Sequence, residues 1–216
     1  MSKYKAVIFD LDGTLLNTLE DLTDAVNYAL EKHGFTTHSV DDIRKFLGNG
    51  VRALMELAVP GGAESLAFEE TFQDFKEYYS ANCHNKTKPY DDIIELLQTL
   101  LEKGYKVAIV SNKMDEAVKE LREVYFNDLI KVAIGESENV RKKPAPDTVN
   151  EALKQLGCTA EESVYVGDSE VDIETAANAG MICVSCLWGF RDEAWLKENG
   201  ATYIIDEPMN ILKLLD

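Results

Sequence analysis

The sequence predicts an α/β protein with a doubly wound parallel sheet and one inserted helical domain. Short, continuously apolar segments alternate with helical segments over most of the 216 residues, a pattern typical of strands covered by helices on both faces. Between residues 17 and 88 the pattern is helical only, which exceeds the single crossover helix that joins two parallel strands. We therefore expect an α/β core from residues 1–16 and 89–216 and a helical cap domain from residues 17–88.

The predicted strands of the core are short apolar runs separated by helical segments. They are expected at residues 5–9, 106–110, 132–134, 163–166, 181–187 and 203–205. The first helix between them is predicted from Asp91 to Lys103, and later helices are predicted to end near Gly157 and Gly180, because glycine is a common helix stop.

The inserted segment contains four predicted helices. The first is indicated by apolar residues at three- and four-residue spacing, namely Leu19, Leu22, Val26, Ala29 and Leu30. Ser39 and Asp42 have the spacing of a capping box, which predicts a helix from there to Leu47. Two more helices are predicted at residues 51–59 and 66–79, and the aromatic residues of the second are expected to form the core of this domain.

The composition excludes several classes of partner. Acidic residues outnumber basic ones by 39 to 22, which gives a formal net charge of −17. This charge argues against binding to nucleic acid and to anionic membrane surfaces. Because no apolar run approaches the ~18 residues of a membrane span, we expect no contact with membranes.

From the N-terminal residues and the cysteines, we expect a cytoplasmic protein. The first residues lack the small-residue cleavage site of a signal peptide. The four cysteines are too few and too scattered for a disulfide framework. Cys183 and Cys186 lie in a predicted strand, where positions three apart point to opposite faces, so we expect neither a zinc site nor a redox pair. A monomer or a homodimer is expected.

Polar residues directly follow three of the predicted strands. Asp10 and Asp12 follow the first, Ser111–Lys113 the second, and Asp168 a later one; Lys143 and Asp172 are near in sequence. Ligands bind at the carboxyl ends of the strands in open parallel sheets, so we expect these side chains to converge. Several carboxylates in one crevice require a cation, and oxygen ligands of this kind suit Mg²⁺.

The spacing of these residues indicates their chemistry. Asp10 and Asp12 can lie near one reacting centre, where one acts as a nucleophile and the other as acid and base. Gly13 permits a sharp turn whose amide N–H groups can bind an anion. Ser111 and Asn112 offer hydrogen-bond donors to phosphate oxygens, and the compact charge of Lys143 suits phosphate.

Four segments resemble the four ordered motifs of the haloacid dehalogenase superfamily: Asp10-Leu11-Asp12-Gly13-Thr14, Ser111-Asn112-Lys113, Lys143-Pro144 and Gly167-Asp168-Ser169-x-x-Asp172. The resemblance implies a Rossmann-like core and a Mg²⁺-dependent phosphatase. It also implies that Asp10 forms an aspartyl-phosphate and that Asp12 protonates the leaving alcohol and then activates water. The metal ligands would be Asp10, Asp168 and the Asp12 main-chain carbonyl, with Asp172 acting partly through water, and the phosphate contacts would come from Thr14, Ser111, Asn112 and Lys143.

Within that superfamily the sequence is most similar to the phosphoglycolate phosphatase subfamily, which implies a small acidic phosphomonoester as substrate. The similarity rests on residues 16–22, on the Ser-Asn-Lys motif, and on Gly48-Asn49-Gly50 followed by Arg52. In relatives, a cap loop at this position faces the active site and recognises the leaving group, so residues 48–50 and Arg52 are candidate specificity residues. Lys113 is a further candidate, for neutralising a substrate carboxylate.

Other functions remain open at this point. An inorganic pyrophosphatase differs only in its leaving group. A sugar-phosphate phosphatase or phosphomutase is less favoured, because such mutases carry a histidine soon after the first motif and residues 17–22 contain none. Dehalogenases and phosphonate-cleaving relatives lack the second aspartate, which is present here as Asp12. A non-enzymatic phospho-receiver module has no need of a cap.

Overall fold

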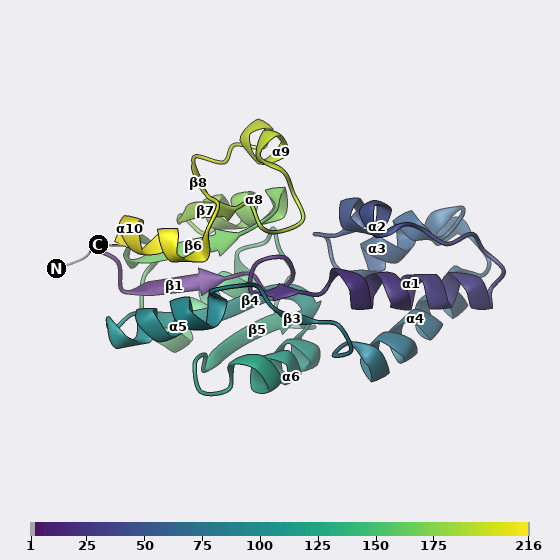
Figure 1. Ribbon diagram of the computed structural model, residues 1–216, viewed down its shortest axis with the longest axis horizontal. Coiled ribbons are helices and arrows are strands. Elements are labelled where there is room, and N and C mark those ends of the chain that lie inside the picture. The colour runs from purple at the N-terminus through teal and green to yellow at the C-terminus, as the bar shows by residue number, and fades with distance from the viewer. Residues whose placement is uncertain (1–2, 216) are drawn as a thin grey trace. The chain divides into compact units, whose positions relative to one another are not determined.

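A parallel sheet of six strands forms the centre of the larger of two units in the computed structural model, which describes residues 3–215 (Figure 1). This unit comprises the residues up to Leu16 and those from Pro89 onward. Across the sheet, the strands are β5 (Val132–Glu136), β4 (Lys106–Met114), β1 (Ala6–Phe9), β6 (Ser163–Gly167), β7 (Ile182–Cys186) and β8 (Tyr203–Ile205). All neighbouring strands are parallel.

Helices follow the strands in alternation, as the apolar pattern predicts. They are α5 (Ile93–Glu102), α6 (Asp115–Phe126), α7 (Asp147–Leu156), α8 (Glu170–Asn178), α9 (Glu193–Glu198) and α10 (Leu212–Leu215), with short 3₁₀ turns at Ala160–Glu162 and Pro208–Ile211. The sequence pattern does not predict α9 and α10, because helices this short show too few turns for apolar periodicity to be recognised.

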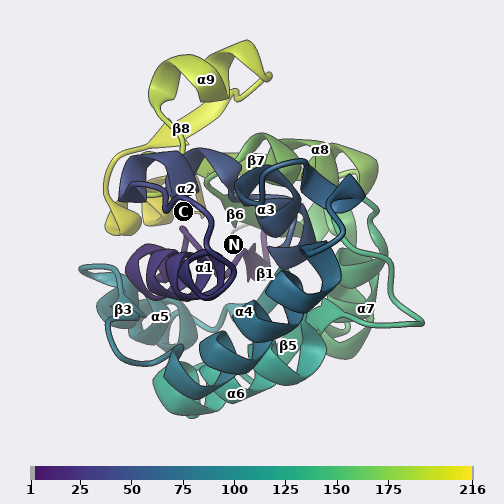
Figure 2. The same ribbon diagram turned by 90° about the vertical axis from the view of Figure 1, so that its right-hand side faces the viewer.

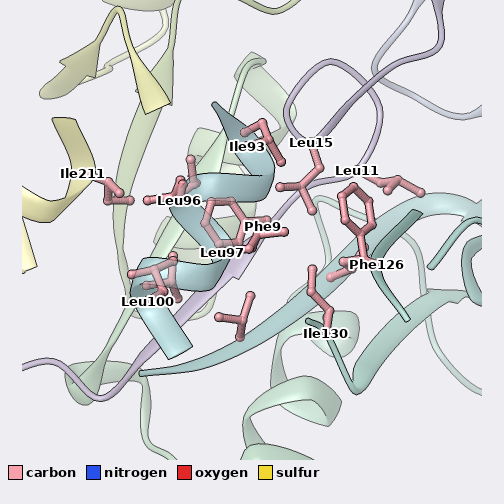
Figure 3. Close-up of a cluster of buried hydrophobic side chains, with 14 of the residues drawn as sticks. Phe9, Leu11, Leu15, Ile93, Leu96, Leu97, Leu100, Phe126, Ile130 and Ile211 are labelled. Carbon is pink, nitrogen blue, oxygen red and sulfur yellow. The ribbon is translucent and has the colours of Figure 1, made fainter. Parts of the chain in front are cut away.

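The two faces of the sheet are both covered by helices. Val7 and Phe9 of β1 lie in a buried cluster with side chains of α5, α6 and the C-terminal turns, as Figure 3 shows around Phe9. Ile8, between them in the sequence, lies in a second buried cluster with side chains of α7 and α8. This alternation is the period of a strand, and it confirms the predicted doubly wound α/β fold.

Strand β4 is longer than the apolar run predicts. It continues through Ser111–Lys113 to Met114, with a shift in register against β5 between Val110 and Met114. The motif that was expected after the strand therefore lies within its last residues. Two additional strands of two residues each, β2 (Leu16–Asn17) and β3 (Lys88–Pro89), pair with each other and are not predicted by the sequence.

The second unit, Asn17–Lys88, is helical. Its helices are α1 (Leu19–Lys32), α2 (Val40–Phe46), α3 (Val51–Ala58) and α4 (Phe68–Asn82), with a 3₁₀ turn at Gly62–Glu64 (Figure 2). The predicted capping box is confirmed: the Ser39 hydroxyl accepts from the Asp42 N–H at 3.2 Å, and the Asp42 carboxylate accepts from the Ser39 N–H at 3.2 Å. The aromatic residues of α4 are buried and stacked in series, as expected of a core: Phe68, Phe72, Phe75 and Tyr79.

One buried carboxylate joins the two ends of this helical unit. Asp21 of α1 accepts hydrogen bonds from the backbone N–H groups of Lys86, at 3.0 Å, and of Thr87, at 2.8 Å. An Asp21→Ala variant should lower the free energy of unfolding by about 1–3 kcal/mol, because it leaves these donors without their acceptor.

Urea unfolding of the Asp21→Ala variant measures this loss. Asp24→Ala is the matched control, since the exposed Asp24 pairs with the side chain of Lys86 at 2.7 Å, and an exposed ion pair contributes at most about 1 kcal/mol. Equal losses in the two variants would contradict the role of Asp21.

Candidate active site

The sheet order places the three polar strand ends side by side. β1 lies between β4 and β6. From β1 the chain builds β4 and β5 on one side and then returns to build β6, β7 and β8 on the other, so β1 marks the point where the strand order reverses. Ligands of open parallel sheets bind at the carboxyl ends of the strands at this point.

Three of the four carboxylates that were expected to converge meet there, and all three are buried, whereas Asp12 is not in this cluster. Asp10, Asp168 and Asp172 each contribute an oxygen, and these oxygens lie within 4.8 Å of one another. Two glycines make room for them. A Cβ atom on Gly13, whose φ is +88°, would lie 2.5 Å from the Asp168 carboxylate, and a Cβ atom on Gly167 would lie 2.3 Å from the Asp172 carboxyl carbon. Glycine is therefore required sterically at both positions.

Lys143, which precedes α7, is the cation of this cluster. Its Nζ lies 2.8 Å from Asp10 Oδ1 and 2.7 Å from Asp172 Oδ1, and it is almost completely buried. Burial alone would lower the pKa of Lys143, but the charges of the two carboxylates raise it above its usual value. Lys143 is therefore a permanent positive charge in this site.

The carboxylates differ in their tendency to ionise. Burial, followed by the charge of Asp172, raises the pKa of Asp10 well above its usual value. The same two causes raise the pKa of Asp168 to about 7. Burial opposes the ionisation of Asp172, yet Lys143 and the hydrogen bonds that Asp172 accepts lower its pKa. Of the three carboxylates, Asp172 is thus the one whose ionised form is stabilised by the protein's own groups.

The hydrogen bonds to Asp172 come from two directions. Its Oδ1 accepts from Lys143 Nζ and from the hydroxyl of Tyr165 at 2.9 Å. Its Oδ2 accepts from the Ser169 hydroxyl at 2.6 Å and from the N–H groups of Ser169 at 3.1 Å and Asp168 at 3.2 Å. With five donors already on its two oxygens, Asp172 has less capacity for a direct ligand bond than Asp10 and Asp168.

The donor set fits a divalent cation. The three clustered carboxylates and the ammonium group of Lys143 sum to a charge of −2 when all are ionised. The ligand atoms are carboxylate oxygens, which hard divalent cations prefer. Because a bound divalent cation would balance this charge, the cluster is compatible with such an ion.

Asp12 forms a second, separate ion pair. Its Oδ1 lies 3.2 Å from Nζ of Lys113, whose side chain is almost completely buried. Lys113 therefore neutralises a carboxylate of the protein itself in this structure, and its contact with a substrate carboxylate stays a prediction.

The expected phosphate ligands have different surroundings. The Ser111 hydroxyl accepts from the Lys113 N–H at 3.1 Å, and a hydroxyl that accepts one bond still has its hydrogen to donate. The Asn112 side chain instead makes two bonds to the backbone of Lys143, at 2.6 and 3.1 Å. The Thr14 hydroxyl donates to Asp168 Oδ1 at 3.0 Å. In these contacts, Asn112 and Thr14 serve to hold other members of the site.

The candidate specificity loop belongs to the helical unit. Gly48 and Gly50 have φ values of +120° and +85°, and Gly50 is the N-cap residue that directly precedes α3. Positive φ is the region that favours glycine, so residues 48–50, including Asn49, form a turn that these glycines permit. Contact of this loop with a substrate stays a prediction.

Arg52, on α3, is engaged within its own unit. Its Nη2 lies 2.6 Å from Glu69 and its Nε lies 3.3 Å from Glu56. The guanidinium carbon lies 5.0 Å from the ring centre of Phe68 and 5.5 Å from that of Phe72. Binding of a substrate carboxylate by Arg52 would thus replace an existing carboxylate partner.

Several members of the site have little sequence signal. Ser169 is an exception, because it belongs to the fourth motif and forms a capping box with Asp172 at the start of α8. Tyr165 gives no signal beyond that of a core strand residue, yet its hydroxyl lies 3.2 Å from Lys143 Nζ and donates to Asp172. The segment from Trp188 to Arg191 lies outside the four sequence motifs, yet the Phe190 N–H donates to Asp168 Oδ2 at 2.8 Å.

This geometry agrees with comparisons to known proteins. The model of the haloacid dehalogenase-like hydrolase family matches residues 7–186. A phosphoglycolate phosphatase of Aquifex aeolicus is 34% identical over 98% of this chain and 97% of its own length, and phosphoglycolate phosphatase 1 of Pseudomonas aeruginosa is 31% identical over 98% of this chain and 80% of its own. The chain therefore belongs to the haloacid dehalogenase-like hydrolase family. The relatives establish it as a phosphatase within that family.

Solved structures show the same fold over the whole chain. A protein from Lactobacillus delbrueckii subsp. bulgaricus has a TM-score of 0.94 and 38% identity, covering 100% of this chain and 99% of that one. A predicted phosphoglycolate phosphatase from Haemophilus somnus has a TM-score of 0.91 and 28% identity, with 100% of both chains covered. Among the described residues, no helix has the length and apolar character needed to cross a membrane.

The raised pKa of Asp168 predicts how pH changes the stability of the metal-free protein. Because the pKa is about 7 when folded and about 3.9 in an unfolded chain, the folded state holds this proton more tightly. Its contribution to stability is complete below the unfolded pKa and is lost as pH rises through the folded one. We therefore expect a lower melting temperature in chelator at about pH 8 than at about pH 5.5.

Divalent cation should restore the melting temperature mainly at the higher pH, where the carboxylates are ionised. An Asp168→Asn variant should show a smaller pH dependence than the wild type, since it lacks the titrating group. A metal-free wild type that is equally stable at both pH values would contradict the prediction. Calorimetric scans of the two proteins decide it.

Proposed function

We propose that this phosphatase uses Mg²⁺ to hydrolyse small phosphomonoesters that carry a carboxylate, such as phosphoglycolate, through a phosphoryl group transferred to Asp10. The observation that carries the proposal is the position of Asp10, which directly follows β1 and lies in a buried cluster with Asp168, Asp172 and Lys143. Asp10 and Asp168 would hold the metal directly together with the Asp12 carbonyl, and Asp172 would act partly through water.

The residues of the chain account for both steps of hydrolysis. In the first, an Asp10 oxygen bonds to phosphorus, the ester P–O bond breaks, and the Asp12 carboxyl gives its proton to the leaving alcohol. In the second, Asp12 accepts a proton from water, the water oxygen bonds to phosphorus, and the Asp10–phosphorus bond breaks to release phosphate. When bound, Mg²⁺ supplies positive charge that brings the phosphate to the carboxylates and stabilises the charge of the transition state.

The phosphate contacts divide into direct and indirect ones in this proposal. The Ser111 hydroxyl and the Lys143 ammonium would bind the transferring phosphoryl oxygens, because cations and donors placed there stabilise the developing charge. Asn112 would fix the backbone of Lys143, to which its side chain is bonded twice. Thr14 would fix Asp168, to which its hydroxyl donates.

The substrate class is supported by the names of the relatives, which describe phosphoglycolate phosphatases. The helical unit would serve as a cap that selects the leaving group, with the loop at residues 48–50 and Arg52 as its specificity residues. A planar guanidinium group matches a carboxylate with two parallel hydrogen bonds, which suits the leaving group of such a substrate.

A screen of phosphomonoesters and pyrophosphate, ranked by kcat/KM in Mg²⁺ and in chelator, tests the proposal. We expect phosphate release over many turnovers, the highest kcat/KM for a phosphorylated carboxylate, and no activity in chelator until Mg²⁺ is added. A preference for pyrophosphate or for sugar phosphates would overturn the substrate class. Full activity in chelator would overturn the role of the metal.

Replacement of Arg52 tests the proposed role of the cap. With a small acidic phosphomonoester, Arg52→Ala should lower kcat/KM by the equivalent of about 2–3 kcal/mol, the scale of a charge-assisted hydrogen bond. With an aryl phosphate that carries no carboxylate, kcat/KM should change little. The matched control is Glu69→Gln, which removes the carboxylate that binds Arg52 in this structure. In this variant, kcat/KM for the acidic substrate should be unchanged or higher. Equal losses on both substrates would assign Arg52 to the fold of the helical unit.

A further inference from the structure

We propose that the segment from Trp188 to Arg191, which follows β7, positions the Asp168 carboxylate for metal binding. The inference rests on the proposed function, which assigns Asp168 as a metal ligand. It adds a fourth strand end to the site beyond the four sequence motifs. Three kinds of contact made by this segment support it.

The first contact is a hydrogen bond to the carboxylate itself. Phe190 donates its backbone N–H to Asp168 Oδ2 at 2.8 Å, while the Thr14 hydroxyl donates to Oδ1 at 3.0 Å. One donor therefore holds each oxygen. Removal of either donor would free the carboxylate to rotate, so the segment shares control of its orientation with Thr14.

The second contact is steric and explains the glycine in this segment. Gly189 is not among the glycines with positive φ, so its backbone conformation is open to other residues. A Cβ atom there would nevertheless lie 2.3 Å from Asp168 Cβ and 2.5 Å from the Gly13 carbonyl oxygen. Glycine is required at position 189 because its backbone packs directly against Asp168 and the turn after β1.

The third set of contacts fixes the two ends of the segment. Trp188 donates its indole N–H to the Thr14 carbonyl at 2.9 Å. Arg191 binds both oxygens of Glu170, at 2.8 and 3.1 Å, and Glu170 also accepts from the indole of Trp195 at 2.9 Å. The Thr14 hydroxyl also donates to Asp168, and Glu170 lies between Asp168 and Asp172 in the sequence. The segment is therefore tied to the site at both ends.

These contacts predict an effect on metal affinity. Groups that orient a metal ligand typically change metal affinity by about 10- to 100-fold when they are removed. An alanine at position 189 would displace either the segment or the Asp168 carboxylate. We therefore expect Gly189→Ala to bind metal about tenfold or more weakly than the wild type.

Titration with Mn²⁺, followed by its electron paramagnetic resonance signal and by displacement with Mg²⁺, measures the affinity without substrate. The variants are Gly189→Ala, Trp188→Phe and Asp168→Asn, the last as the reference for a lost ligand. Gly104→Ala is the control for a destabilising glycine replacement, because Gly104 has a φ of +84° and no atom within 4 Å of an added Cβ. It should melt at a lower temperature but bind Mn²⁺ within about twofold of the wild type.

The outcomes separate the inference from the function on which it rests. Weaker binding by Gly189→Ala, and by about three- to tenfold for Trp188→Phe, the range of one lost hydrogen bond, supports the positioning role. A folded Gly189→Ala protein with wild-type affinity overturns it. If Gly189→Ala does not fold, wild-type affinity in Trp188→Phe overturns it. Equal affinity in Asp168→Asn and the wild type overturns the proposed metal site, and this inference with it.

Discussion

An Asp10→Asn variant should lose turnover by about three orders of magnitude or more while the chain remains folded. The amide has nearly the same shape as the carboxylate but is too weak a nucleophile to attack phosphorus. It also removes one of the charged ligands that the proposed function assigns to the metal. Steady-state phosphate release with a good phosphomonoester substrate measures the loss.

The stability of the same variant distinguishes loss of chemistry from loss of fold. Asp10 is a buried acid whose pKa is raised by burial and by the charge of Asp172, so its ionisation opposes folding at neutral pH. The neutral amide should therefore leave the metal-free melting temperature unchanged or raise it. A stable variant that kept a tenth of the wild-type kcat would exclude Asp10 as the nucleophile.

The positions of Asp10 and Asp168 could be predicted because each directly follows a strand of the parallel sheet. Residues that follow parallel strands are brought to one edge of the sheet whatever the details of side-chain packing. The motif spacing then identifies which of these residues carry charge. The same reasoning defines the helical segment between residues 17 and 88, since its pattern contains no strand of sheet length.

Residues that act through other residues could not be predicted in the same way. The sequence assigns Asn112 to phosphate, but the structure places Asn112 in the last part of β4 with its amide bonded to the Lys143 backbone. In the sequence, Tyr165 cannot be distinguished from an ordinary core residue. Its hydroxyl donates to Asp172 because β6 ends beside α8. Such roles depend on which loop approaches which strand end, and a local pattern does not encode that.

A Lys143→Met variant should lose both activity and stability, because it removes the only positive side chain paired with the clustered carboxylates among the described contacts. Methionine fills a similar volume but leaves Asp10 and Asp172 without their cation. Removing one partner of a buried ion pair typically costs about 3–5 kcal/mol in the free energy of unfolding. Phosphoryl transfer should fall by about two orders of magnitude or more, since a cation on the phosphoryl oxygens is lost.

The pH dependence of the stability loss in Lys143→Met provides a second test. In the wild type, Lys143 is the largest influence that lowers the pKa of Asp172; without it, burial should raise that pKa. A group with a raised folded pKa contributes stability at low pH that is lost as pH rises through that pKa. The stability difference between wild type and Lys143→Met should therefore grow from about pH 5 to about pH 8 in chelator.

Lys142→Met is the matched control for this experiment, because it removes the same charge from the adjacent, exposed position. A surface substitution of this kind should change the free energy of unfolding by no more than about 0.5 kcal/mol and should leave kcat unchanged. If urea unfolding gave the same small change for both variants, the carboxylates would not need Lys143 as their counter-ion. The charge balance that makes the cluster a site for a divalent cation would then have to come from another group.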